Sequence, residues 1–203
     1  MNYARSVHEV ARDLVGATLR HGETAGRIVE VESYHEEEPA SHAYIGPRPR
    51  TEVLFGPPGF AYVYRSYGIH ALVNAVAEKD GVGAAVLIRA IEPLDGIELM
   101  RERRRVARDE ELTNGPGKLT EALGIGLELN GVSLEQGPIL IEPPPAGARE
   151  PRIVTGTRIG ITKAVELPWR FCDATSRHVS RPWPEAMRRR RVHVRGRSGV
   201  AMR

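Results

Sequence analysis

The run at residues 27–34, Arg-Ile-Val-Glu-Val-Glu-Ser-Tyr, constrains the fold of this chain more than any other segment. Its β-branched residues favour an extended strand over a helix. Side chains alternate between the two faces of a strand, so Glu30, Glu32 and Tyr34 are expected on the same face. A carboxylate and an aromatic ring at the end of a mostly apolar strand are compatible with a structural ion pair or with acid–base chemistry.

The rest of the chain alternates between helical and extended patterns, which indicates an α+β fold in a single domain. A short amphipathic helix is expected after a capping box formed by Ser6 and Glu9, and a turn at Gly22 separates two strands. Two strands joined tightly at Gly68 predict a hairpin with Tyr67 at its tip. Further strands are predicted at residues 84–91, 139–141, 158–161 and 167–171, and helices at residues 95–106 and 114–123.

Composition excludes several classes of protein. With 41% hydrophobic and 27% charged residues, the chain is globular, and no apolar run approaches the roughly 20 residues of a transmembrane helix. The N-terminus lacks a signal-peptide pattern and Cys172 is the only cysteine, so we expect a cytoplasmic protein without disulfides or a cysteine zinc site. Residues 188–203 carry seven arginines and no acid, which suits either phosphate contact or a solvated tail.

Glu32 is the strongest candidate for acid–base chemistry. Partial burial at the end of an apolar strand would raise its pKa, whereas a neighbouring guanidinium would hold it ionised. Arg89, inside the apolar run at residues 85–90, is the candidate partner. An ion pair that only joins two strands is the commoner explanation for such a combination, so both possibilities stay open.

Aromatic residues gather between positions 34 and 67, although the whole chain is only 5% aromatic. The group consists of Tyr34, His42, Tyr62, Tyr64 and Tyr67. Each tyrosine taken alone is more commonly a packing residue. An acid surrounded by flat rings is nevertheless how a protein would hold an unstacked base and act on its sugar bond.

Three polar features complete the pattern. Asn74 places an amide in an otherwise apolar strand, which implies a specific hydrogen-bonding or steric role. The glycine-rich helix start before Lys118 can hold a phosphate, although its spacing is not that of a Walker A loop. His35 and His42 lack the spacing of a common metal motif, so neither a metal nor another cofactor is expected.

Several blocks occur in an order that resembles one known family, the alkyladenine (3-methyladenine) DNA glycosylases of the bacterial type. They are the run at residues 27–34, Ala40-Ser41-His42, Phe55-Gly56-Pro57-Pro58-Gly59, Tyr62-Val63-Tyr64-Arg65-Ser66-Tyr67-Gly68, Leu87-Ile88-Arg89-Ala90, Asn114-Gly115-Pro116-Gly117-Lys118-Leu119 and Leu167-Pro168-Trp169-Arg170-Phe171. Independent blocks in the right order over nearly the whole chain make this resemblance far more specific than any single motif.

The resemblance implies a monofunctional DNA repair glycosylase. Such an enzyme flips a damaged purine out of duplex DNA and hydrolyses its N-glycosidic bond, which leaves an abasic site. The implied fold is a single domain on a curved, largely antiparallel sheet flanked by helices, with a protruding hairpin that inserts into DNA. The implied partner is double-stranded DNA containing damaged purines, bound by a monomer without a cofactor or a membrane.

By position, the family's roles fall on residues that the pattern already singled out. Glu32 would be the general base, and Arg89 would help to hold the attacking water. The other implied roles are stacking on the flipped base for Tyr34, His42 and Tyr64, exclusion of guanine for Asn74, a wedge in the minor groove for Tyr67, and DNA contact for Arg48, Arg50 and Lys118.

Two segments depart from the family pattern. Thr51 replaces the usual asparagine of an arginine-containing loop, and residues 174–180 replace a more usual Gly-Asn-Pro-aromatic stretch. Two other functions also stay open: a nucleic-acid-binding module that keeps the aromatic groove without hydrolysis, and a carbohydrate hydrolase that uses Glu30 and Glu32. No lysine lies near the catalytic strand, so no lyase activity through a Schiff base is expected.

Overall fold

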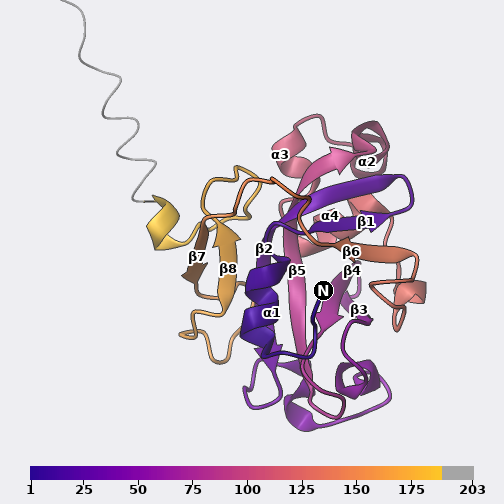
Figure 1. Cartoon of the computed structure of the whole chain (residues 1–203), viewed down its shortest axis with the longest axis vertical. Coiled ribbons are helices and arrows are strands. Elements are labelled where there is room, and N and C mark those ends of the chain that lie inside the picture. Colours follow the sequence, from indigo (N-terminus) through magenta and orange to yellow (C-terminus); the bar gives the residue numbers. More distant parts are fainter. Residues whose placement is uncertain (189–203) are drawn as a thin grey trace, which may run out of the picture.

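The computed structural model describes residues 1–188. The arginine-rich segment at residues 188–203 therefore lies, apart from its first residue, outside the described residues. Within the described part, eight strands form one sheet whose strand pairings are all antiparallel (Figure 1). The predicted α+β fold on a largely antiparallel sheet is confirmed.

The strands follow one path through the sheet, β3-β4-β5-β2-β1-β6, and β8 joins this path by pairing with both β2 and β7. Their bounds are β1 (Thr18–His21), β2 (Thr24–His35), β3 (Ala61–Ser66), β4 (His70–Val76), β5 (Ala84–Asp95), β6 (Ile139–Glu142), β7 (Ile153–Gly156) and β8 (Arg170–Asp173). The two longest strands, β2 and β5, pair along most of their length and form the centre of the sheet.

Helices and single helical turns cover the sheet and connect its strands. The named elements are α1 (Val7–Leu14), α2 (Ile97–Arg104), α3 (Asp109–Leu112) and α4 (Pro116–Leu123), with the 3₁₀ turns η1 (His42–Ile45), η2 (Glu52–Phe55) and η3 (Leu127–Leu129); residues 185–188 are also helical. In Figure 1, α1 lies in front of β2 and β5, whereas α2 and α3 lie at one end of the sheet.

The two faces of β2 have different contacts. Ile28 and Val31 pack into the main apolar core together with α1, whereas Glu30 and Glu32 lie on the opposite face. The register between β2 and β5 shifts on both sides of Glu30, between Ile28 and Glu30 and again between Glu30 and Val31, and this irregularity allows Ile28 and Val31, three positions apart, to share the core face. Glu30 and Glu32 both bind Arg89, so the two carboxylates lie together, as predicted.

The predicted hairpin is formed by β3 and β4, which lie at one end of the strand order. Tyr67 follows the last residue of β3 and is 87% exposed. Tyr67 and Gly68 both have positive φ, 49° and 72°, which is a strained conformation for a tyrosine. Because Tyr67 lies in the turn, strand alternation does not fix its direction.

Some local predictions are wrong. Residues 158–161 form no strand, since Gly160 has a φ of 78° and the Ile159 N–H donates to a side chain; the strand in this region is β7, which ends at Gly156. The strand predicted at residues 167–171 begins only at Arg170. Ser6 caps α1 by position, but its side chain makes no capping hydrogen bond, so the capping box is also wrong.

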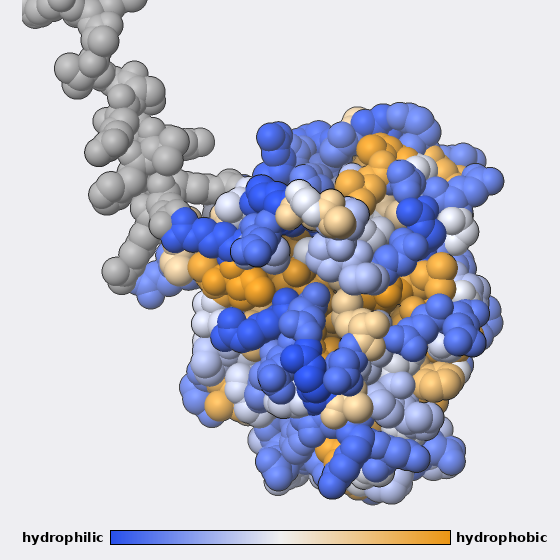
Figure 2. Space-filling model, in the orientation of Figure 1, coloured by the Kyte–Doolittle hydropathy of each residue, from blue (hydrophilic) through white to orange (hydrophobic). Residues whose placement is uncertain are grey.

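Figure 2 shows the side of the molecule on which α1 lies. Its surface is largely hydrophilic, with apolar residues exposed between the polar ones. No helix among the described residues is both long enough and apolar enough to cross a membrane.

Candidate active site

A cavity of about 880 Å³ lies on the face of β4 and β5 that is turned away from α1. Alternation on β5 separates its surroundings from the core, because Ala85, Leu87 and Arg89 line the cavity whereas Val86 and Ile88 belong to the core. The rest of the wall comes from β2, residues 39–43, Arg50, Leu54, β3 with Tyr67, Gly83, the start of α4 and residues 159–163. Segments far apart in the sequence therefore meet at one site.

Glu32 is a fully buried carboxylate that does not itself line the cavity but binds two residues that do, Tyr34 and Arg89. Among the described residues it accepts hydrogen bonds from the Tyr34 hydroxyl (2.8 Å) and Arg89 Nη1 (3.0 Å) at Oε2, and from the Ile159 N–H (2.7 Å) at Oε1. Burial raises the pKa of Glu32 above its ordinary value, although the charge of Arg89 and the Ile159 hydrogen bond act in the opposite direction. A raised pKa makes this carboxylate a better proton acceptor once it is ionised.

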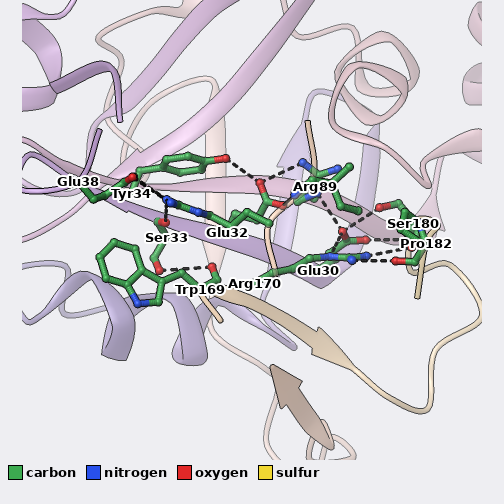
Figure 3. A network of polar contacts seen from close by, with 12 residues as sticks. Glu30, Glu32, Ser33, Tyr34, Glu38, Arg89, Trp169, Arg170, Ser180 and Pro182 are labelled. Atoms are coloured by element: carbon green, nitrogen blue, oxygen red, sulfur yellow. Dashed lines mark hydrogen bonds and ion pairs between the residues drawn. The ribbon is translucent and has the colours of Figure 1, made fainter. Parts of the chain in front are cut away.

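Arg89 connects Glu32 to a second buried carboxylate, Glu30 (Figure 3). Glu30 accepts hydrogen bonds from Arg89 Nε (2.9 Å), Arg170 Nε (2.8 Å), and both the N–H (2.6 Å) and hydroxyl (2.8 Å) of Ser180. Burial alone would raise the pKa of Glu30, but the two guanidinium charges and the Ser180 bonds outweigh it and hold that pKa below its ordinary value. The two neighbouring carboxylates therefore have opposite pKa shifts.

Aromatic rings form the wall of the cavity near Glu32. Tyr34 lines it and donates its hydroxyl to Glu32. The rings of His42 and Tyr64 meet edge to face with centroids 4.5 Å apart, and Tyr62 stacks on Tyr64 at 5.3 Å. Burial, helped by the charge of Arg50, lowers the pKa of His42, so its imidazole is neutral at neutral pH.

Asn74 lies on β4 directly opposite Tyr62 on β3 and also lines the cavity. Its Nδ2 donates to the Tyr62 main-chain oxygen at 2.9 Å. The amide predicted to need a partner in an apolar strand thus has one, and this bond fixes the side chain in the cavity wall.

The residues predicted to face DNA lie around the mouth of the cavity, with one exception. Tyr67, Arg50 and Lys118 all line the cavity, and Lys118 Nζ is 2.8 Å from Asn114 Oδ1. Arg48 is exposed but is not part of the cavity lining. The Thr51 hydroxyl lies 3.1 Å from the Arg48 N–H, which donates to it, so the departure at position 51 still supplies a side chain that closes this arginine loop.

Several residues of the site carry no role in the sequence-based interpretation. Arg158 and Ile159 were expected in a strand, and Arg170 and Ser180 follow Glu32 by well over a hundred residues. The one available signal was an arginine inside a short apolar segment, which Arg170 shares with Arg89. Within residues 1–188 there is no group of three or more His, Cys, Asp or Glu side chains that could hold a metal ion.

Comparison with known proteins gives a consistent result. A family model described as methylpurine-DNA glycosylase matches residues 1–177. Curated proteins of Rhodopseudomonas palustris and Bradyrhizobium diazoefficiens are each 55% identical to this chain over 90% of its length. The aligned regions span 87% and 90% of these two relatives, respectively. A protein of Methanoculleus marisnigri is 51% identical over 88% of this chain and 96% of its own length.

All three relatives carry the name "Putative 3-methyladenine DNA glycosylase". The family match spans most of the chain, and the order of blocks found in the sequence agrees with it. This chain belongs to the methylpurine-DNA glycosylase family.

Proposed function

We propose that this protein excises alkylated purines of the 3-methyladenine type from duplex DNA, with Glu32 as the general base. Members of its family are monofunctional DNA repair glycosylases, which are hydrolases of N-glycosidic bonds. The observation that carries the assignment of Glu32 is a buried carboxylate, held by three donors in the described chain, beside a cavity walled by aromatic rings.

In this reaction a water oxygen forms a bond to C1′ of the deoxyribose while the bond from C1′ to the purine nitrogen breaks. The electron pair of the broken bond goes to the departing purine, and a cationic alkylated purine leaves as a neutral molecule. Glu32 takes the proton of the attacking water. Burial acts to lower the pKa of Arg89, but the charges of Glu32 and Glu30 outweigh it and keep the guanidinium charged. Arg89 would hold the attacking water beside Glu32.

The aromatic wall supports an alkylated purine as the ligand. Tyr34, His42 and Tyr64 offer flat surfaces on which a flipped base can stack, and a cationic base gains additional attraction from the ring faces. A protonated histidine would repel such a base. The lowered pKa of His42 removes this repulsion at neutral pH.

Duplex DNA would approach from the mouth of the cavity. Tyr67 is exposed there in a strained turn, which suits a side chain that fills the gap left by the flipped nucleotide. Arg48, Arg50 and Lys118 would contact phosphates, and the fixed amide of Asn74 would clash with the exocyclic amine of guanine. We propose that a monomer carries out the whole reaction.

The test compares the wild type with Glu32→Gln on DNA methylated in vitro. We expect single-turnover release of 3-methyladenine to fall by about 10²–10⁴-fold, the usual contribution of a general base. Glu23→Gln is the matched control, because it makes the same chemical change at an exposed position between β1 and β2. Equal release by the wild type and Glu32→Gln would remove Glu32 from the reaction.

A wild type that bound an abasic-site duplex tightly and released no base would favour the binding module instead.

A further inference from the structure

Arg158 and Glu38 form a buried ion pair behind the proposed active site. The side chain of Arg158 is 0% exposed and that of Glu38 is 5% exposed. The guanidinium donates to both carboxylate oxygens of Glu38, at 2.5 and 2.9 Å, and to the Ser33 carbonyl at 3.1 Å. This pair joins the segment after β7 to the turn that follows β2.

Neither member of the pair lines the cavity. The Arg158 guanidinium lies over the Tyr34 ring, 4.6 Å from its centroid, and 5.2 Å from the centroid of the Trp169 ring. Tyr34 itself lines the cavity, so Arg158 supports the ring on which the purine is proposed to stack.

Ile159, the residue after Arg158, connects the Arg158–Glu38 pair to Glu32. The Ile159 N–H donates to Glu32 Oε1 at 2.7 Å, and within residues 1–188 it is the only donor to that oxygen. The other donors, Arg89 and the Tyr34 hydroxyl, both bind Oε2. Two of the three hydrogen bonds of Glu32 therefore come from residues beside Arg158: Tyr34, whose ring it contacts, and Ile159, the next residue in the chain.

We infer that Arg158, fixed by Glu38, is a positioning residue that orients both the Tyr34 ring and the Ile159 N–H against Glu32. This inference rests on the proposed function of Glu32. The competing explanation is that the Arg158–Glu38 pair only stabilises the fold, but buried ion pairs contribute little net stability. In the described chain Arg158 Nε has no partner, whereas both terminal nitrogens donate to Glu38.

Arg158→Lys tests the inference, because lysine keeps the charge beside Glu38 but loses the planar fork and the stack on Tyr34. We expect the single-turnover excision rate to fall by about 10–100-fold, as small misplacements of catalytic groups do. Binding to a duplex with an abasic-site analogue should change little, because that ligand has no base to stack on Tyr34.

The acid limb of the rate profile should also move to higher pH. Loss of the Ile159 hydrogen bond removes an interaction that favours the ionised form of Glu32 and so raises its pKa further. Titration of the Glu32 side-chain carbon by NMR, assigned through its absence in Glu32→Gln, measures the same shift without any reaction.

Arg27→Lys is the matched control. Arg27 also pairs with a fully buried carboxylate, Asp173, at 2.8 Å, but it makes no contact with Glu32 or Tyr34 in the described residues. We expect it to change thermal stability while leaving the excision rate and the Glu32 titration unaltered. Should Arg158→Lys fail to fold, Glu38→Gln carries the same expectations, because it removes the carboxylate that fixes Arg158 and so lets the guanidinium move away from the Tyr34 ring.

The inference is overturned if the folded variant loses thermal stability but keeps the wild-type rate and the wild-type Glu32 titration. It is overturned equally if Arg27→Lys moves both readouts as far. A wild type without glycosylase activity would instead refute the proposed function, and the NMR titration would still decide whether Arg158 positions Glu32.

Discussion

Glu30 and Glu32 offer a stability experiment in which the same substitution should have opposite consequences. Both side chains are fully buried, both bind Arg89, and they lie two residues apart on one face of β2. Their pKa values shift in opposite directions. We predict that Glu30→Gln strongly destabilises the fold and that Glu32→Gln does not.

The magnitude for Glu30 follows from its four donors among the described residues, which are two guanidinium groups and the N–H and hydroxyl of Ser180. Glutamine keeps a single acceptor oxygen and turns an NH₂ group toward the remaining donors. The bonds from Arg89 and Arg170 are then no longer made to a charged oxygen, Arg170 loses its carboxylate partner, and Arg89 keeps only Glu32. Breaking a buried pair in this way costs about 3–5 kcal/mol.

For Glu32→Gln we expect no such loss in the free energy of unfolding. A carboxyl group whose pKa is higher in the folded than in the unfolded chain lowers stability at pH values above that folded pKa. Glutamine at this position carries no charge and removes that penalty; its oxygen can keep the bonds from Arg89 and Tyr34, and only the bond from the Ile159 N–H is then lost. At pH 7 we expect a free energy of unfolding within about 1 kcal/mol of the wild type, or above it.

Urea denaturation followed by circular dichroism measures both effects, provided that the denaturant slope is unchanged between variants. The pH dependence supplies an internal check. A carboxyl group with a lowered folded pKa stabilises above its ordinary value of 4.5, and this contribution disappears as the pH falls through the folded pKa. The difference between the wild type and Glu30→Gln should therefore shrink in acid.

Equal unfolding free energies for the two glutamine variants would refute this reasoning, as would a larger loss for Glu32→Gln. Either result would mean that Glu30 and Glu32, which share Arg89, do not have separate roles in stability and in catalysis.

Three further predictions concern the proposed reaction. The excision rate should fall on the acid side with a midpoint above 4.5, because burial raises the pKa of Glu32, and a midpoint at or below that value in single-turnover assays would contradict the assignment. Tyr67→Ala should weaken binding to an abasic-site duplex without changing thermal stability, since the side chain is 87% exposed; unchanged binding would exclude the wedge. Lys118→Gln should reduce the slope of log affinity against log salt by about 1 if the lysine contacts a phosphate, and an equal slope would exclude that contact.

Local sequence rules predicted the parts of this site that depend on one strand or one hairpin. Alternation placed Glu32 and Tyr34 on one face of β2, and the apolar run around Arg89 predicted a strand that proved to be its neighbour. These predictions succeeded because strand periodicity and β-propensity act over only a few residues.

The same rules failed where a tertiary contact determines the backbone. Residues 158–161 carry branched apolar side chains and so were expected to extend, but Gly160 adopts a left-handed conformation and the Ile159 N–H turns toward Glu32. Nothing within a few positions of Ile159 encodes a partner 127 residues away. Ser180 is likewise joined to Glu30 across 150 residues, so its role could not be read from its own segment.

The division between the two carboxylates explains why the site needs so many distant segments. A single arginine beside one glutamate would hold it ionised and inert. Here Arg89 is shared, and Arg170 and Ser180 satisfy Glu30 so completely that it fixes Arg89 in place. Glu32 keeps only part of the stabilisation and retains a raised pKa. Substitutions that remove hydrogen bonds of Glu30 should therefore change the excision rate only by moving Arg89. Substitutions of Arg158, which packs on Tyr34, should change the pKa and the orientation of Glu32 itself.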